Sequence, residues 1–413
     1  MNHPEGRPPA PMPPIWLLAG LIALGPLSTD LYLPALPTIA TAFGTDAAGV
    51  QWTLSGFLLV FAPSQLVYGP LADRFGRRPA MLWGLGLFLA GTVACAVAPS
   101  LAALIAARMV QAVGACAGPV VARAVVRDTV PAERAPAVFA TMAGLMSLAP
   151  AIGPILGGVV TALSGWRANF LLLGAVALVL AGLVGRRLGE TAPSLDRNAL
   201  DPGSLARVYG MLLADRWFLG HAAVATASYS GLFCFISGSS HVVQRGLGFG
   251  PEVYGVVFAA AVAGYLAGSL LVRRLSGRVP PRRMMQAGSL WCLCFGWAGP
   301  ASLALAGPSL ATVALPLILY MVGFAVAQPN AQAGAISPFP TLAGRASALL
   351  GFVQWSIAAL AGLALGLVLD EQGWAMAFGI ALSGTASALA VALLPDAPGR
   401  HTPDRPAQAS GGG

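Results

Sequence analysis

The sequence predicts an all-α integral membrane protein, and its composition and apolar runs carry that prediction. Of 413 residues, 57% are hydrophobic and only 9% are charged, and the mean hydropathy is +0.75. A soluble domain of average composition carries roughly 25% charged residues, so this chain lacks the polar surface that water requires. The apolar runs are long, continuous and rich in Ala, Leu and Gly, without the alternation that is typical of barrel strands. Helices that cross a lipid bilayer are therefore expected.

Twelve apolar runs follow one another along the chain. Each has about 20 residues or more, which is enough for a helix to cross a hydrocarbon layer of about 30 Å. The connections at 98–100 and 306–308 are short, so the spans on either side of them should form tight hairpins. The expected spans lie near 15–36, 50–71, 80–98, 101–124, 136–162, 168–185, 217–240, 252–275, 284–305, 308–333, 346–368 and 374–395.

One long polar stretch divides the spans into two sets of six. It covers residues 186–216 and is expected to be a cytoplasmic linker between an N-terminal six-helix bundle at 15–185 and a C-terminal six-helix bundle at 217–395. The tails, 1–14 and 396–413, are rich in Pro and Gly and should be disordered in the cytoplasm. No cleavable signal peptide is evident, so the first span is expected to remain as an anchor.

The distribution of arginine predicts the orientation in the membrane. All 23 basic residues are Arg, and if the N-terminus is cytoplasmic, twenty of them lie on the inner side. Only Arg167 and Arg245 fall on the outer side, and Arg108 lies within a span. The positive-inside rule therefore places both termini in the cytoplasm. Basic loops beside anionic lipid account for the net charge of +8, so no nucleic-acid partner is needed.

The sequence offers no enzymatic site or metal site. The five cysteines all fall inside spans, and their odd number argues against a disulfide framework. No zinc motif, phosphate-binding loop or nucleophile elbow is found, so neither a metal nor another bound cofactor is expected. An intramembrane enzyme would need such a constellation, and a receptor would need a sensory domain outside the membrane. Both classes are disfavoured, and a transporter driven by an ion gradient is favoured.

Two permanently charged residues lie well inside the expected spans at one depth. Asp30 precedes Pro37 by seven residues, and Arg108 follows Leu101 by seven residues. At 1.5 Å per residue, each side chain should lie about 10 Å below the outer helix ends. Because an isolated charge is expensive inside a membrane, the sequence predicts that Asp30 and Arg108 pair with each other.

Two roles for this pair remain open at this point. The pair could anchor the first helix to the fourth, as a purely structural contact. Alternatively, Asp30 could take up a proton, since a movement that changes its distance from Arg108 would change the proton affinity of the carboxyl group. Three neighbouring polar residues are candidates for cavity lining: Tyr32, Gln65 and Gln111.

The loop between the second and third spans reads GPLADRFGRRP. Its candidate functional residues are Gly69, Asp73, Arg74, Gly76, Arg77 and Arg78. A topology signal would explain the arginines but neither the carboxylate nor the glycines. Glycines allow sharp turns, and a carboxylate can pair with arginine or cap a helix, so a gate latch between the two bundles fits all of them.

The fifth span combines small residues with a proline. Gly153, Gly157 and Gly158 lie about one turn apart on a face suited to close helix packing, and Pro154 should bend the helix. Packing alone would also explain the glycines, because similar pairs occur in other spans. A specific role for this segment therefore depends on its similarity to known motifs.

These motifs resemble those of the major facilitator superfamily. The loop GPLADRFGRRP resembles its loop motif, RMVQAVGACAG at 108–118 its fourth-helix motif, and APAIGPILGG at 149–158 the motif of its drug/proton antiporters. With STDLYLPALP in the first span, the chain is similar to Bcr/CflA-type multidrug efflux transporters. The resemblance is dense over 27–190, and Val272 stands where a counterpart of Asp73 would lie in the second half.

The resemblance implies a twelve-helix fold of two bundles, with a cavity between them and alternating access. It implies proton-coupled efflux of small hydrophobic or amphipathic drug-like molecules, with Asp30 and Arg108 coupling the proton, the loop motif acting as a gate and the fifth span shaping the interface. The proton would be the coupling ion, with no other cofactor, in a monomer surrounded by lipid. Proton-coupled uptake of a small solute remains the alternative, and a non-transporting membrane protein is a remote one.

Overall fold

The computed structural model describes residues 12–131, 134–146, 148–196, 199–339 and 342–395. Helices and turns make up this part of the chain, which contains no strand. Eleven of its helical segments are long and apolar enough to cross a membrane. The predicted all-α membrane fold is therefore confirmed. The N-terminal tail up to residue 11 and the tail 396–413, which were expected to be disordered, lie outside the described residues.

The helices fall into two groups that follow the sequence. The first group holds α1 (Ile15–Asp30), η1 (Leu33–Ala35), α2 (Leu36–Phe43), α3 (Ala47–Phe75), α4 (Arg77–Ala96), α5 (Leu101–Ala115), α6 (Ala117–Thr129), α7 (Ala135–Met146), α8 (Leu148–Ser164) and α9 (Arg167–Arg187). The linking helix α10 (Pro202–Ala214) comes next. The second group holds α11 (Arg216–His241), η2 (Val242–Gly246), α12 (Pro251–Leu275), α13 (Pro281–Ala306), α14 (Leu310–Ile336), α15 (Ala343–Val368) and α16 (Trp374–Ala392).

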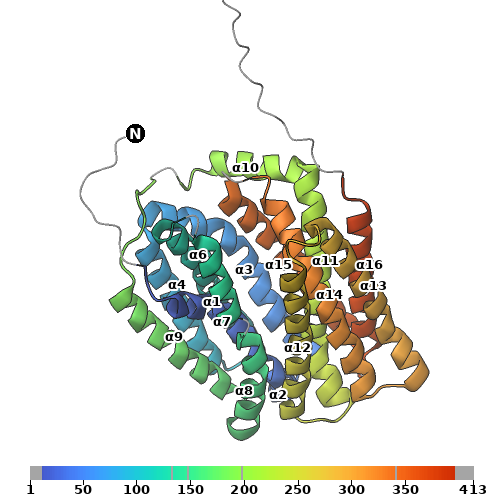
Figure 1. Ribbon diagram of the computed structural model, residues 1–413. Coiled ribbons are helices and arrows are strands. Elements are labelled where there is room, and N and C mark those ends of the chain that lie inside the picture. Colours follow the sequence, from blue (N-terminus) through green and yellow to red (C-terminus); the bar gives the residue numbers. More distant parts are fainter. Residues whose placement is uncertain (1–11, 132–133, 147, 197–198, 340–341, 396–413) are drawn as a thin grey trace, which may run out of the picture.

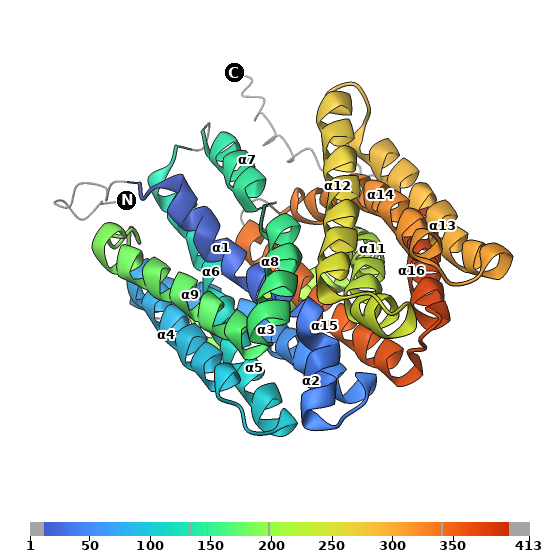
Figure 2. The same cartoon turned by 90° about the horizontal axis from the view of Figure 1, so that it is seen from below.

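The two groups lie side by side and meet along two helix pairs. Figures 1 and 2 show α1–α9 on one side and most of α11–α16 on the other. In the contacts between the groups, α3 packs against α15 and α8 packs against α12. These two pairs form the main contact between the groups.

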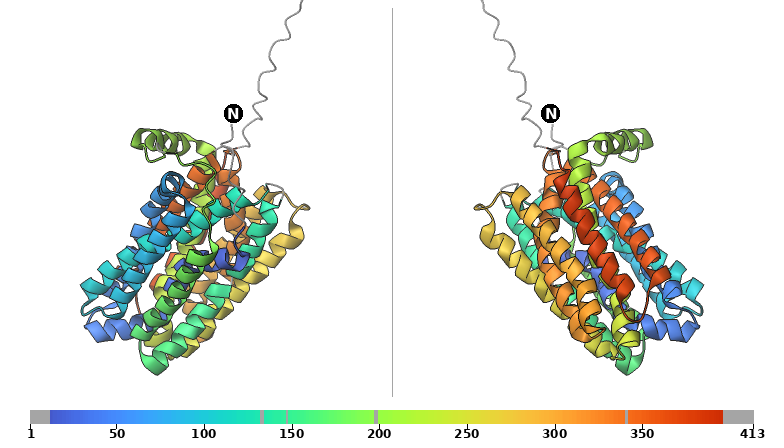
Figure 3. Two further views of the ribbon diagram at one scale, coloured as in Figure 1. Left: turned by 90° about the vertical axis from the view of Figure 1, so that its left-hand side faces the viewer. Right: turned by 90° about the vertical axis from the view of Figure 1, so that its right-hand side faces the viewer.

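The molecule has two faces, which we name after the helices that mark them. The α10 face carries α10, which lies across the helix ends in Figure 3. The α2 face, at the opposite end, carries α2 and the beginning of α3 (Figure 1). Each span runs from one face to the other, so the position of a residue in its helix tells which face it is near.

The linker predicted at 186–216 contains a helix that the sequence did not reveal. Asp201 caps α10 by accepting a hydrogen bond from the backbone N–H of Ser204 at 2.8 Å, and Pro202 occupies its first turn. Leu212 is fully buried, whereas Met211 and Leu213 are exposed. An amphipathic segment of 13 residues is too short to cross a bilayer, so the length and hydropathy that mark a span do not reveal this helix.

Proline interrupts the first span near the α2 face. Helix α1 ends at Asp30, one 3₁₀ turn follows, and α2 continues from Leu36. Pro34 and Pro37 lack the backbone N–H that would continue a regular helix. The first span therefore breaks directly after Asp30, whereas Pro26 lies inside a continuous α1. The fifth span is described in two segments, α7 and α8, on either side of residue 147, which lies outside the described part.

Candidate functional site

Arg108 is the most deeply buried charged residue of the described chain. It lies in α5 with no solvent exposure. Its guanidinium donates to the carbonyl oxygen of Ser28 at 3.0 Å, to Oε1 of Gln111 at 2.6 Å and, over a longer 3.4 Å, to the carbonyl oxygen of Thr53. Its Nη2 atom has no hydrogen-bond partner among the described residues. Arg108 therefore ties α1, α3 and α5 together mainly through backbone acceptors.

Two aromatic rings complete the surroundings of this guanidinium. Its Cζ atom lies 4.8 Å from the ring centroid of Tyr32 and 4.4 Å from that of Phe57, which is the geometry of cation–π contacts. The hydroxyl groups of Tyr32 and Thr53 are 2.6 Å apart, and Gln111 donates to Oγ1 of Thr92 at 2.8 Å. The structure thus brings Tyr32 and Gln111, two of the candidate lining residues, into direct contact with the arginine.

Asp30 lies near this network but does not join it. It is the last residue of α1 and is 5% exposed, and it makes no hydrogen bond or ion pair with any described residue. The predicted ion pair with Arg108 is therefore not formed in this conformation, which corrects that expectation. Equal depth in the membrane fixes the level of two side chains but not the directions in which they point. Arg108 instead donates a hydrogen bond to the carbonyl group of Ser28.

The side chain of Asp30 lies against α8. A Cβ atom added to Gly153 would lie 2.8 Å from the Cβ atom of Asp30. The next small residue of α8, Gly157, meets the backbone carbonyl of Leu31.

The same segment of α8 forms the close contact between the two groups. A Cβ atom on Gly158 would lie 2.5 Å from the carbonyl oxygen of Pro251 in α12. In the reverse direction, a Cβ atom on Gly255 would lie 2.8 Å from the carbonyl oxygen of Pro154. Such distances leave no room for a side chain, so glycine is required for this approach of the two helices. The candidate residues of α8 thus lie between α1 and α12.

The loop motif forms an ionic cluster inside the first group. Arg77 donates to Oδ2 of Asp128 at 2.8 Å and pairs with Asp73 one turn before it. These residues lie on α4, α6 and α3. Every ion pair of the motif in the described chain stays within the first group, so this conformation shows a tie among three helices and no latch to the second group. Sequence analysis missed Asp128, which lies 51 residues away from Arg77 and had no spacing signal.

A second carboxylate binds the backbone of the same loop. Gly76 has φ +103°, a conformation that favours glycine, and it ends α3 before α4 begins. Glu190 accepts from the N–H groups of Arg77 at 2.8 Å and Arg78 at 3.2 Å. A negative charge at the N-terminus of α4 is favoured by the helix dipole. The segment after α9 is therefore fastened to the loop.

The other predicted residues lie around the Arg108 network and the ionic cluster of the loop motif. The guanidinium of Arg74 lies over the ring of Phe75, with Cζ 5.3 Å from the centroid, and Gly69 has open space where a Cβ atom would lie. Gln65 is buried in α3 and faces Gly351 of α15, at the contact between the groups.

Aromatic residues missed by the sequence analysis bridge the groups near Gln65. Phe61 of α3 packs edge-on against Trp355 of α15 with centroids 5.3 Å apart, and Trp355 packs against Tyr229 of α11 at 5.0 Å. Aromatic residues are ordinary in apolar spans, so only their position in the fold distinguishes these three.

The stability of the loop cluster gives a first prediction. Asp73 has a side chain that is 50% exposed, whereas the side chains of Arg77 and Asp128 are 10% and 9% exposed. Asp128→Ala should cost about 1–3 kcal/mol of stability because it removes the buried partner of the Arg77 guanidinium and leaves only the half-exposed Asp73, and Asp73→Ala should cost less than about 1 kcal/mol. Thermal unfolding of both purified variants measures the difference. Equal loss would show that burial does not set the strength of this cluster.

Activity and abundance of the Asp73→Ala protein test the role of the motif. A gate function predicts slower transport at normal abundance, because stability is nearly unchanged. A proportional loss of both quantities would instead support the topology signal.

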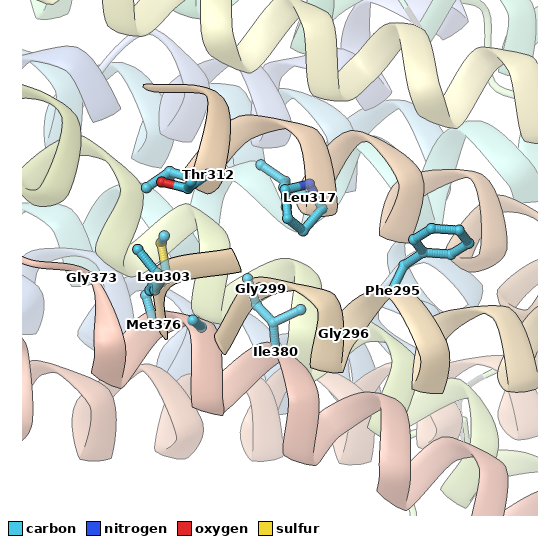
Figure 4. A pocket seen from close by; sticks show the side chains of 12 residues that line it. Phe295, Gly296, Gly299, Leu303, Thr312, Leu317, Gly373, Met376 and Ile380 are labelled. Atoms are coloured by element: carbon cyan, nitrogen blue, oxygen red, sulfur yellow. The ribbon is translucent and has the colours of Figure 1, made fainter. Parts of the chain in front are cut away.

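An apolar pocket elsewhere in the molecule is not part of this site. Figure 4 shows it between α13, α14 and α16, where Phe295, Leu317 and Met376 contribute to its wall. No charged residue lines it, and the hydroxyl group of Thr312 is already used in the N-terminal cap of α14. Within the described residues, no group of three His, Cys, Asp or Glu side chains could hold a metal ion.

Comparison with known sequences gives consistent matches over almost the whole chain. The sequence profile of the Major Facilitator Superfamily matches residues 18–362. An uncharacterised MFS-type transporter, YdgK of Bacillus subtilis strain 168, is 29% identical over 369 residues, which are 89% of this chain and 91% of that protein. The multidrug resistance protein MdtL of Escherichia coli is 29% identical over 380 residues, which are 92% of this chain and 94% of MdtL.

Solved structures of transporters share the fold. A D-xylose–proton symporter superposes with a TM-score of 0.73 at 15% identity, covering 92% of this chain and 95% of the symporter. A POT family transporter in complex with 5-aminolevulinic acid superposes with a TM-score of 0.74 at 14% identity, covering 93% and 97% of the two chains. Identities this low establish a common architecture and nothing about substrates.

Proposed function

The chain belongs to the Major Facilitator Superfamily, and from this premise we propose that it exports drug-like small molecules in exchange for protons. As a member of this superfamily it is a multi-pass membrane transporter of small molecules and not an enzyme. Export is supported by its similarity to MdtL, a protein named for multidrug resistance. The proposed substrates are hydrophobic or amphipathic, because the helix interface contains Phe61, Trp355 and Tyr229.

The observation that carries the proton coupling is the burial of Asp30 without a described partner. An ionised carboxylate is expensive in such surroundings, whereas a protonated carboxyl group is tolerated. A carboxylate that merely held two helices together would have a cationic or hydrogen-bonding partner here. Asp30 is therefore proposed to carry the exchanged proton.

Alternating access would then change the surroundings of Asp30. In this conformation Gly153 of α8 lies against its side chain, and α8 packs closely on α12. A rotation of the two groups that separates α8 from α12 would admit water to the carboxyl group or bring it nearer to Arg108. Either change favours the ionised form and releases the proton. Arg108 has one unused donor atom, Nη2, for such an approach.

The proposal also covers the orientation of the protein, its membrane and its oligomeric state. The α10 face is proposed to be cytoplasmic, because most arginine residues outside the spans belong to it. The protein is proposed to work as a monomer in a bacterial inner membrane, with the proton as its coupling ion and no other cofactor. No nucleic-acid partner is proposed.

Transport in inverted membrane vesicles tests the direction and the coupling. Vesicles from a drug-susceptible host that expresses the protein should accumulate a drug when the lumen is acidified, because proton exit then drives drug entry. A protonophore should abolish the accumulation, and vesicles without the protein provide the background. Accumulation that ignores the pH gradient would refute proton antiport. Inward movement of drug with protons in right-side-out vesicles would identify an uptake symporter instead.

A further inference from the structure

Hydrogen bonds between the two groups are concentrated at the α2 face. In the described part of the chain five such bonds are found, and all five join the broken end of the first span or the start of α3 to the end of α11 and η2. They run from Gln51 to Ser237 (2.8 Å), from Ser240 to the carbonyl of Leu33 (2.8 Å), from Gln244 to the carbonyl of Pro34 (3.0 Å), and from Arg245 to the carbonyl of Pro37 (3.2 Å) and the hydroxyl of Thr41 (2.6 Å).

The acceptors exist because proline breaks the first span. Pro37 has no N–H group, so the carbonyl of Leu33 loses its donor four residues ahead and the carbonyl of Pro34 loses its donor three residues ahead. The carbonyl of Leu33 still accepts from the backbone N–H of Leu36, and its second lone pair is open to a partner from outside its own helix. The second group supplies that partner.

The donors are held ready by their own helix. Ser240 and Gln244 lie one helical turn apart, and the side-chain amide of Gln244 also donates to Oγ of Ser240 at 2.8 Å. Ser240 is fully buried. We name the two donors, with the carbonyl groups of Leu33 and Pro34, the carbonyl clamp. The guanidinium of Arg245 makes exposed contacts beside it.

The clamp lies next to the proposed proton-binding carboxyl group along the chain, on the side of the α2 face. Leu33 follows Asp30 by three residues, so the clamp fixes the segment that carries Asp30. Beside the clamp, Gln51, Ser237 and His241 line a small pocket between the groups at the α2 face. No described hydrogen bond joins the groups at the α10 face. In the described part of the chain, the hydrogen-bonded contact between the groups is therefore one-sided.

We propose that the carbonyl clamp is the gate that closes the α2 face, and that its opening admits water and protons to Asp30. This proposal rests on the proposed function, because it assigns the regulation of that same site. Ser240 and Gln244 are positioning residues: they act on the transported molecules only by holding the first span. Opening transfers their bonds to water at the membrane surface, so the closed and open states can remain close in free energy.

Distance measurements in the absence of drug and of a pH gradient test the clamp. Spin labels on cysteines at Thr38 and Phe249, exposed positions on opposite sides of the gate, report its opening in lipid nanodiscs. Cys294, the exposed native cysteine, is first changed to serine. The double variant Ser240→Ala with Gln244→Leu should raise the population with the longer distance, by about fivefold for each bond lost.

A matched double variant provides the control. Ser230→Ala with Gln332→Leu removes a serine and a glutamine whose hydrogen bonds stay within the second group. It should leave the distances unchanged. Distances that are the same in wild type and clamp variant, or that shift equally in both double variants, would overturn the proposal.

A second variant keeps the test decisive if the double variant fails to fold. Gln244→Glu preserves the size of the side chain but replaces a donor with an acceptor that faces the carbonyl of Pro34. It should therefore also lengthen the distance between the two spin labels. An unchanged distance in this folded variant would overturn the proposed role of the clamp. Because neither drug nor proton gradient is present, a negative vesicle experiment would count against export and leave the clamp measurement standing.

Discussion

Replacing Asp30 with asparagine should reduce drug export to the background level of cells that lack the protein. The two side chains have nearly the same size, but the amide cannot take up and release a proton. Resistance of a susceptible host and accumulation driven by a pH gradient in inverted vesicles should both disappear. Binding of drug to the purified variant should persist, since only the exchange of the proton is removed.

The same variant separates the switch from the structural anchor. An anchor to Arg108 predicts that Asp30→Asn loosens the contact between the first and fourth spans and lowers the thermal stability. The structure makes that contact through the carbonyl group of Ser28, which the substitution leaves intact. We therefore expect unchanged or slightly higher stability together with lost transport.

Asp46→Asn is the matched control for this experiment. Asp46 caps α3 at the α2 face by accepting from the N–H of Gly49 at 2.8 Å, and asparagine is also a good helix cap. The control should export drug normally. Export by a well-expressed Asp30→Asn protein that still follows the pH gradient would contradict the assignment of the proton to Asp30.

The sequence predicted the spans because lipid imposes a strong and simple constraint. A helix that crosses the hydrocarbon layer must be long and apolar whatever its neighbours are, so composition alone located the described spans to within several residues. The interruption at 31–35 follows from Pro34 and Pro37, which a reading of span length alone does not weigh. The linking helix α10 was not, because it lies outside this constraint and only its polar and apolar faces mark it.

The partners of the charged residues were beyond a reading of the sequence for a different reason. Depth along the membrane follows from residue counting, but rotation of each helix about its axis depends on packing with several others. Asp30 and Arg108 share a level and still point differently. Asp128 reaches the loop from α6 and Glu190 from the segment after α9, and the loop motif itself carried no information about where its arginines would bind.

Two contacts that hold the first span in place connect Asp30 to a movement between the two groups of helices. The carbonyl clamp holds the first span just beyond Asp30, and Gly153 holds it from the side of α8. The clamp lies at the α2 face and Gly153 lies near the start of α8 against the same broken span, so a movement of that span disturbs both contacts at once. In the proposed cycle, the proton site is coupled to the gate because one broken helix carries the carboxyl group and the clamp acceptors.

Arg108→Ala should cause the largest loss of stability of any substitution in the spans. Truncating a long buried side chain costs about 2–5 kcal/mol. The change also strands the carbonyl of Ser28 and Oε1 of Gln111, and an acceptor left unpaired in the interior costs about 1–3 kcal/mol. A thiol-reactive dye measures unfolding conveniently, because four of the five native cysteines are buried and react only when the fold opens.

The pattern among variants shows what the arginine contributes. Arg108→Lys keeps the charge but replaces a planar fork by a single ammonium group, so it should recover only part of the stability. Arg123→Ala is the control, since Arg123 is exposed and its guanidinium donates to the carbonyl of Pro119 in its own helix. If Arg108→Ala unfolds at the temperature of the wild type, the network around Ser28 and Gln111 does not hold the first group together. If it is destabilised as expected, the buried guanidinium is the tie among α1, α3 and α5 against which Asp30 can move.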